Sequence, residues 1–249
     1  NKIGDGLDRA VEESVKNERL KTDLITNVSH DIKTPLTSII NYVDLLKREN
    51  IQDPKIQGYL DILEAKAQRL KHLTEDVVEA SKISSGNITM EYMNINFVEM
   101  INQTTGEFAE KFEKRNLQIV LNVPEKPVMV RTDGRRMWRV IENIYNNAAK
   151  YALEGTRVYA DLIEKEHTVE FSLKNISEQP LNISADELTE RFIRGDVSRS
   201  TEGSGLGLSI AKNLTELQGG KFELYLDGDL FKVTIVFPKA VVGQSVTKS

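Results

Sequence analysis

The 249-residue sequence contains no cysteine, which excludes disulfides and thiolate metal sites and fits a reducing compartment. Its three histidines, His30, His72 and His167, are too far apart to form a metal-ligand spacing. No stretch comes near the roughly 20 apolar residues that span a bilayer, and no signal-peptide pattern is present. The formal net charge is −5, so the composition gives no electrostatic case for binding nucleic acid.

The first 85 or so residues do contain helical periodicity. Two apolar stripes are separated by RENIQDP, a polar segment that predicts a turn, and two long helices joined in this way form an antiparallel hairpin. One hairpin buries little of either stripe, so we expect a homodimer in which two hairpins make a four-helix bundle. The stripes are Leu20, Leu24, Val28, Ile32, Leu36, Ile39, Val43 and Leu46, then Ile56, Leu60, Leu63, Ala67, Leu70, Leu73 and Val77.

The polar segment KISSGN, at 82–87, indicates a domain boundary. We therefore predict a helical domain over 1–86 and a second domain over 87–249, whose last residues, 240–249, form a frayed tail. Strands and helices mix in the second domain, which predicts an α+β fold with an α/β sandwich and a mixed sheet. The expected helices cover 97–116, 135–152 and 209–218, and the expected strands cover 117–123, 128–130, 158–165, 168–175 and a hairpin over 221–237.

The segment NVSHDIKTPLTSI places His30 beside Asp31 inside the first predicted helix. With Val28 and Ile32 facing the core, His30 points about 200° away, toward solvent, and Thr34 lies one turn further on the same face. Pro35 lacks an N–H, so the helix should bend one turn beyond the histidine.

An exposed histidine beside a carboxylate has two interpretations. One is an ordinary surface residue of a helical bundle. The other is a nucleophile, because a neutral imidazole can attack phosphorus while the carboxylate holds the other ring nitrogen and accepts its proton. The Thr34 hydroxyl could position a water molecule. The second interpretation requires a phosphate donor elsewhere in the chain.

The predicted helix over 135–152 carries Asn143, Asn147, Lys150 and Tyr151 on one face. An asparagine carbonyl oxygen is a suitable ligand for Mg²⁺, and a lysine can contact a phosphate. The alternative is a solvated amphipathic helix, although asparagine is a mediocre helix former at interior positions.

The glycine-rich segment EGSGLGLSIAK opens the next predicted helix. Gly203, Gly205 and Gly207 allow the backbone to approach a phosphate closely, and a helix N-terminus favours negative charge. The spacing matches neither the dinucleotide fingerprint nor the P-loop. The long polar stretch over 177–202 suits a lid over a nucleotide.

Four segments in this order resemble the sensor histidine kinases of two-component systems, over about residues 14–238. NVSHDIKTPLTSI resembles that family's phosphoacceptor box and RVIENIYNNAAKYA its asparagine box. ERFIRGD resembles the lid segment, and GSGLGLSIAK the second glycine box. The resemblance implies a dimerisation and phosphotransfer hairpin followed by a catalytic ATP-binding domain. It also implies a cytoplasmic location behind a membrane-spanning sensor region, which would precede the helix at RAVEESVKNERLK.

The resemblance also implies roles for individual residues. His30 would be phosphorylated by ATP, with Asp31 as general base, and would pass the phosphoryl group to an aspartate of a response regulator. The regulator would dock on the bundle around Ser38 to Asn41. Thr34 would orient water when the partner is dephosphorylated. Asn147 would ligate Mg²⁺, supported by Asn143. The remaining nucleotide contacts would be Lys150, Tyr151, Phe192, Arg194, Gly203, Gly205, Leu206 and Gly207.

One box departs from the family pattern. Where the family has Asp-x-Gly-x-Gly after a strand, with the Asp accepting from the adenine amine, this chain has Asn175 and Ser177 and lacks both glycines. An asparagine carbonyl accepts without charge assistance, which roughly halves hydrogen-bond strength. We therefore expect weakened or altered nucleotide binding.

Two alternatives stay open. One is a regulatory scaffold of the same fold that no longer phosphorylates, which Asn175 and Ser177 favour. The other is an ATPase of the related chaperone and topoisomerase type, in which Glu142 would activate water. The second alternative leaves the His-Asp pair without a role.

Overall fold

The structure is a computed structural model that describes residues 25, 27–49, 51–86, 88–181, 184–189 and 205–240. The described chain divides into two compact units, a helical unit that ends at Ile88 and an α/β unit over 89–181, 184–189 and 207–240, while Gly205 and Leu206 group with the first unit.

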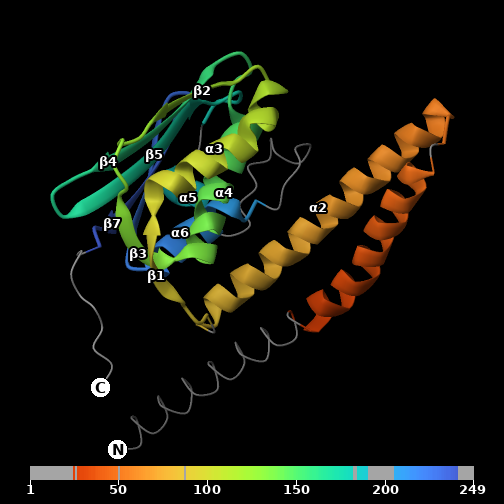
Figure 1. Cartoon of the computed structure of the whole chain (residues 1–249), viewed down its shortest axis with the longest axis horizontal. Coiled ribbons are helices and arrows are strands. Elements are labelled where there is room, and N and C mark those ends of the chain that lie inside the picture. Colours follow the sequence, from red (N-terminus) through yellow and green to blue (C-terminus); the bar gives the residue numbers. More distant parts are fainter. Residues whose placement is uncertain are drawn as a thin grey trace, which may run out of the picture. The chain divides into compact units, whose positions relative to one another are not determined.

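The helical unit is an antiparallel hairpin (Figure 1). Its first helix covers residues 27–48 and continues through Pro35, and its second helix is α2, Pro54–Ser84. Asp53 caps α2 by accepting from the amide of Lys55 at 2.8 Å, and Pro54 occupies the first turn, where its missing N–H costs nothing.

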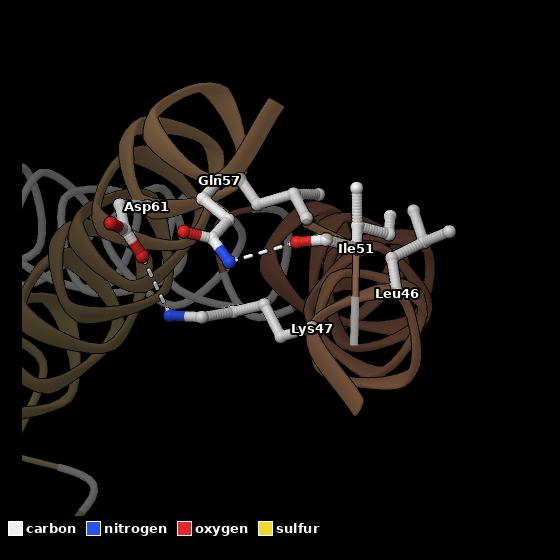
Figure 2. A pocket seen from close by; sticks show the side chains of 6 residues that line it. Leu46, Lys47, Ile51, Gln57 and Asp61 are labelled. Atoms are coloured by element: carbon white, nitrogen blue, oxygen red, sulfur yellow. Dashed lines mark hydrogen bonds and ion pairs between the residues drawn. The ribbon is translucent and has the colours of Figure 1, made fainter. Parts of the chain in front are cut away.

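Ion pairs join the two helices near the turn (Figure 2). The Lys47 ammonium lies 2.8 Å from Asp61 and 2.7 Å from Glu64 on α2. The hydrogen bond to Asp61, and next the one to Glu64, raise the pKa of Lys47. The Gln57 amide donates to the carbonyl of Ile51 at 2.8 Å. These contacts fix the register of the two helices and border a small hollow of about 170 Å³.

Few apolar side chains of the hairpin are buried within one chain. Leu36 and Val43 on the first helix, and Leu60 and Ala67 on α2, are buried at spacings of seven residues, as expected for two helices packed along a single seam. Much of both predicted stripes remains exposed. The exposed large apolar residues are Val28, Ile32, Ile39, Tyr42, Leu45 and Leu46, then Ile56, Tyr59, Ile62, Leu63 and Leu70.

The α/β unit contains two sheets and four described helices. The strands are β1 Tyr92–Asn96, β2 Gln118–Asn122, β3 Met129–Asp133, β4 Arg157–Glu164, β5 Thr168–Ile176, β6 Lys221–Asp227 and β7 Leu230–Pro238. The helices are α3 Phe97–Glu113, α4 Gly134–Tyr151, α5 Ala185–Thr189 and α6 Gly207–Leu217.

The main sheet has the order β2-β4-β5-β7-β6. The β2–β4 pair is parallel and the other pairs are antiparallel, so the sheet is mixed, as predicted. The helices α3, α4 and α6 cover one face of this sheet (Figure 1). The core between the layers includes Tyr145, Phe171 and Ile235, each at most 1% exposed. The α+β fold predicted from the sequence is confirmed.

The predicted helix and strand boundaries are close to the observed ones, but two elements, β1 and α5, were not predicted. β1 pairs with β3 in a separate two-stranded sheet, and α5 forms within the polar stretch after β5. At the other end, Ala240 was expected in the frayed tail, but its amide donates to the Met129 carbonyl at 3.0 Å. Residues 241–249 lie outside the described part of the chain.

Candidate active site

His30 is exposed on the first helix, as predicted, but the premise that Val28 and Ile32 face the core does not hold within one chain, where both are exposed. The side chain of His30 is 80% exposed and that of Asp31 is 84% exposed. The Nδ1 atom of His30 is 3.7 Å from an Asp31 carboxylate oxygen, which leaves Nε2 pointing away from the carboxylate. This distance is longer than a hydrogen bond, but such contacts often shorten only when substrate is bound.

Thr34 lies one turn beyond the histidine and is exposed. Its hydroxyl faces the His30 carbonyl at 3.4 Å, and the Ser38 hydroxyl donates in the same way to the Thr34 carbonyl at 3.3 Å. At 3.4 Å the bond is weak, so the Thr34 hydroxyl can turn toward a water molecule at little cost.

The start of the asparagine-bearing helix, α4, is fixed by a capping residue. Asp133 caps its start, accepting from the amide of Arg136 at 3.0 Å and from the amide of Glu91 at 2.9 Å. Burial alone raises the pKa of Asp133, but these hydrogen bonds outweigh it and the net pKa is lowered. The apolar stripe of α4 is fully buried, as predicted, and comprises Met137, Val140, Ile141, Ile144 and Ala148.

Asn143 lies against the start of α6. A Cβ atom placed on Gly207 would lie 3.1 Å from the Asn143 Oδ1 atom, so the glycine leaves room for that carbonyl. Asn143 is 8% exposed, and its Nδ2 has no hydrogen-bond partner within the described chain. The asparagine helix and the end of the glycine-rich segment therefore meet, and they leave a buried donor unsatisfied.

Asn147 and Lys150 follow on α4 and are partly exposed. The Asn147 side chain makes no hydrogen bond to the other described residues. The Lys150 ammonium donates to the Tyr151 hydroxyl at 2.8 Å and lies 4.6 Å from the centre of the Tyr151 ring. Glu142, the candidate base of the ATPase alternative, is paired with Arg139 at 2.8 Å.

Asn175 is near the end of β5 and is 3% exposed. Its Nδ2 donates to the Ile176 carbonyl at 3.1 Å, while its Oδ1 is buried without a partner in the described structure. Ser177, the other departure from the family pattern, is 8% exposed and its amide donates to the Asp229 carbonyl at 2.7 Å. The segment that replaces the missing glycines is thus tied to the turn between β6 and β7.

Arg115, which was not among the predicted site residues, joins these parts. Its guanidinium donates to the carbonyls of Ala149, at 3.2 Å, and Lys150, and it pairs with the Glu178 carboxylate at 2.7 Å. It satisfies carbonyls that the end of a helix leaves unpaired. No local pattern around Arg115 signals this, because every partner is at least 34 residues away.

The glycine-rich segment and the lid are described only in part. Phe192, Arg194 and Gly203 lie outside the described residues. Gly205 has a φ of +72°, a left-handed conformation that favours glycine. Leu206 is 1% exposed. Among the described residues no group of three or more histidine, cysteine or acidic side chains could hold a metal ion.

Comparison with known proteins matches both halves of the chain to families. Residues 20–86 match the His Kinase A (phospho-acceptor) domain, and residues 132–241 match the histidine kinase-, DNA gyrase B- and HSP90-like ATPase family. The sensor protein VanSC of Enterococcus gallinarum is 32% identical over 225 residues, which are 89% of this chain and 62% of VanSC. The chain spans about a quarter of the length of several longer sensor proteins that also match.

Two solved structures share the fold. Full-length ShkA in complex with AMPPNP matches with a TM-score of 0.73 at 19% identity, covering 89% of this chain and 47% of that one. ThkA in complex with the response regulator protein TrrA matches with a TM-score of 0.58 at 23% identity, covering 90% and 64%. The chain belongs to the sensor histidine kinases of two-component systems. No helix among the described residues is long and apolar enough to cross a membrane.

Proposed function

We propose that this chain phosphorylates itself on His30 with ATP and passes the phosphoryl group to an aspartate of a response regulator. The observation that carries the proposal is the exposed imidazole of His30 with the Asp31 carboxylate on its Nδ1 side. An ordinary surface histidine needs no such neighbour, whereas a nucleophile that must lose a proton during attack does.

The nucleotide end of the reaction is supported by α4 and α6. The residues proposed to hold Mg-ATP are Asn143, Asn147, Lys150 and Gly207, together with Tyr151 and Asn175 toward the base. The unsatisfied Nδ2 of Asn143 and Oδ1 of Asn175 fit a polar ligand, because buried polar atoms without partners are rare in folded proteins. Mg²⁺, held through the amide oxygen of Asn147 and the phosphates, would neutralise charge on the transferring group.

The chemistry then follows from the atoms of His30. The Nε2 lone pair attacks the γ-phosphorus, a new N–P bond forms, and the bond from phosphorus to the bridging oxygen breaks to release ADP. The proton on Nδ1 passes to the Asp31 carboxylate, so the phosphorylated ring is left neutral. In the second step an aspartate of the regulator attacks the same phosphorus, the N–P bond breaks, and the proton returns from Asp31 to Nδ1 so that neutral imidazole leaves.

Two partners accompany this proposal. The first is a second copy of the chain, because the helical unit leaves large apolar side chains exposed on both helices, among them Tyr42 at 68% and Ile62 at 58%. The second is a response regulator, supported by the structural likeness to ThkA, which was solved with one. We also propose that Thr34 positions water when the regulator is dephosphorylated.

The direct test is His30→Gln, which keeps the size and polarity of the exposed side chain. We expect the variant to bind Mg-ATP with unchanged affinity and to lose all acid-labile label from γ-labelled ATP. An acid-labile adduct that persists in the variant would contradict the assignment. His72→Gln is the matched control, since it changes a histidine on α2, and it should label like the wild type.

A scaffold without kinase activity is the second candidate function. One observation favours it: where the family has a glycine-containing segment, Ser177 and Glu178 make hydrogen bonds to Asp229 and Arg115 that restrict the backbone. A nucleotide titration of the wild type separates the two. No binding at millimolar Mg-ATP supports the scaffold, and binding followed by histidine labelling supports the kinase.

A further inference from the structure

The last turn of α4 is closed by groups that do not belong to the helix. The Ala148 carbonyl accepts from the Ala152 amide at 2.9 Å, in the usual helical way. If the helix continued, the Ala149 carbonyl would pair with the Leu153 amide, but that amide donates instead to the Ile176 carbonyl on β5 at 2.8 Å. The end of α4 therefore needs donors from elsewhere in the chain.

Arg115 supplies these donors. Its Nη1 atom donates to the carbonyls of Ala149, at 3.2 Å, and Lys150, and its Nη2 atom donates to the Glu178 carboxylate at 2.7 Å. The Tyr151 carbonyl, the last of the turn, accepts from the Glu178 amide at 2.8 Å. One nitrogen thus bonds to the helix and the other holds the residue that closes the turn. The positive charge also complements the negative end of the helix dipole.

The backbone of Arg115 is fixed as well. Its amide donates to the Phe112 carbonyl at 3.1 Å, and its carbonyl accepts from the Gly155 amide at 3.4 Å. The next residue, Asn116, donates through its side chain to the Glu154 carboxylate at 3.0 Å. The Arg115 side chain is only 25% exposed. The guanidinium is therefore held from both ends and acts as a fixed support for the helix terminus.

The turn that Arg115 completes carries Lys150 and Tyr151, two of the residues proposed to hold Mg-ATP. On the basis of the proposed function, we propose that Arg115 is a positioning residue for the nucleotide, which keeps the last turn of α4 formed before the ligand arrives. Without the guanidinium, the carbonyls of Ala149 and Lys150 lose their donor and the turn opens. The binding-competent form then becomes a fraction of the population, and the apparent affinity falls by that fraction.

The experiment compares the full chain with Arg115→Met, which keeps an apolar stem for packing and removes the charge and the donors. We expect the KM for Mg-ATP in histidine labelling to rise roughly 5–20-fold, while the labelling rate at saturating ATP stays within about twofold, because bound nucleotide re-forms the turn. Arg115→Lys keeps the charge and one donor nitrogen, so it should recover part of the loss, with a KM about 2–5-fold above that of the wild type.

Two further variants test which contact of Arg115 matters. Glu178→Gln removes the ion pair and leaves both helix carbonyls bonded, so KM should rise by no more than about threefold, since an ion pair with a half-exposed carboxylate contributes little. Lys114→Met is the matched control. It removes the neighbouring charge, which pairs with the exposed Glu110 carboxylate at 2.7 Å, and it should label as the wild type does.

Hydrogen exchange reports on the turn without any nucleotide. In Arg115→Met we expect the amides of Ala152 and Glu178 to exchange roughly tenfold faster than in the wild type, because both bond to carbonyls of the last turn. The amide of Ile144, in the buried middle of α4, should keep its rate. Faster exchange at all three amides would mean a general loss of stability and would contradict a local role.

An unchanged KM in Arg115→Met would overturn the inference. A lower saturating rate at an unchanged KM would do the same, since a variant that only folds less completely behaves in this way. If either result came with normal labelling of wild-type His30, the proposed function would stand without this role for Arg115. A wild type that neither binds nor uses Mg-ATP would remove both.

The wild type and Arg115→Lys decide the matter if Arg115→Met fails to fold. Wild-type amides of Ala152 and Glu178 that exchange as fast as those of an unstructured chain would show that the turn is not held. Protected amides there, together with the raised KM expected for Arg115→Lys, would support the inference.

Discussion

The buried hydroxyl of Tyr145 predicts a pH dependence of folding stability whose magnitude follows from the structure. Tyr145 is on α4 and is fully buried among aromatic rings, and its hydroxyl shares a hydrogen bond of 2.8 Å with Thr105 on α3. Burial raises the pKa of Tyr145 to about 12, against an ordinary value of 10.0, although the bond to Thr105 acts in the opposite direction.

The sign of the pH effect follows from this pKa. In the unfolded chain Tyr145 ionises through pH 10, while in the folded chain it stays neutral until about pH 12. Stability is fully present below pH 10 and is lost as the pH rises toward 12. Each pKa unit corresponds to about 1.36 kcal/mol, so a shift of about two units removes roughly 2.7 kcal/mol.

Tyr145→Phe separates the hydrogen bond from the ionisation. At pH 7 we expect the variant to be less stable by about 1 kcal/mol, because the bond to Thr105 is lost. Phenylalanine cannot ionise, so the difference should shrink above pH 10 and reverse before pH 12. The reversal, more than the loss at pH 7, is the distinctive result.

Urea unfolding followed by the fluorescence of Trp138 measures this difference, because Trp138 is the only tryptophan and lies on α4. Taking the difference between variant and wild type at each pH removes the effect of the other groups that titrate. Tyr225→Phe, at a position 55% exposed, is the control and should show no such reversal. A constant difference for Tyr145→Phe from pH 7 to 11.5 would show that the hydroxyl is not kept neutral by burial.

Two glycines with opposite surroundings test packing, and a third tests the site. Gly220→Ala would put a Cβ 2.5 Å from the buried ring of Phe237 and should lower the free energy of unfolding by about 1–3 kcal/mol in urea. Gly106→Ala, inside α3 with nothing within 4 Å of the added Cβ, should raise the free energy of unfolding by about 0.5–1 kcal/mol. Equal effects of the two substitutions would refute the packing argument. The Cβ added by Gly207→Ala would lie 3.1 Å from the Asn143 Oδ1 atom and should weaken Mg-ATP binding by roughly 2–10-fold in a calorimetric titration. An unchanged affinity would contradict this expectation.

The elements that the sequence predicts best are those whose residues repeat along the chain. The apolar stripe of α4 has a helical period and is fully buried. β6 alternates in burial, and the hairpin that joins it to β7 turns at Gly228 and Asp229, where the φ of +56° at Gly228 suits glycine. In these segments local propensity and tertiary packing favour the same structure, so one pattern is sufficient.

Of the two elements that were not predicted, one depends on a partner distant in sequence and the other is very short. β1 shows little alternation in burial, and its partner β3 lies more than 30 residues further on, so no local pattern marks it. α5 has only five residues and begins with a capping box, in which the Glu187 amide donates to the Ser184 hydroxyl and the Ser184 amide donates to the Glu187 carboxylate. The hydrogen bond from the Ser184 amide also lowers the pKa of Glu187.

The base end of the site shows why the altered box is hard to interpret from sequence alone. The neutral Asn175 weakens the bond that a carboxylate would make, which lowers nucleotide affinity. The segment after it is held by the Ser177 amide on Asp229 and by the Glu178 carboxylate on Arg115, so less conformational entropy is lost when a ligand binds. The sequence shows the first effect as two substitutions, while the second depends on Arg115, some 60 residues earlier. Because the two effects oppose each other, we expect a smaller loss of nucleotide affinity than the two substitutions alone suggest.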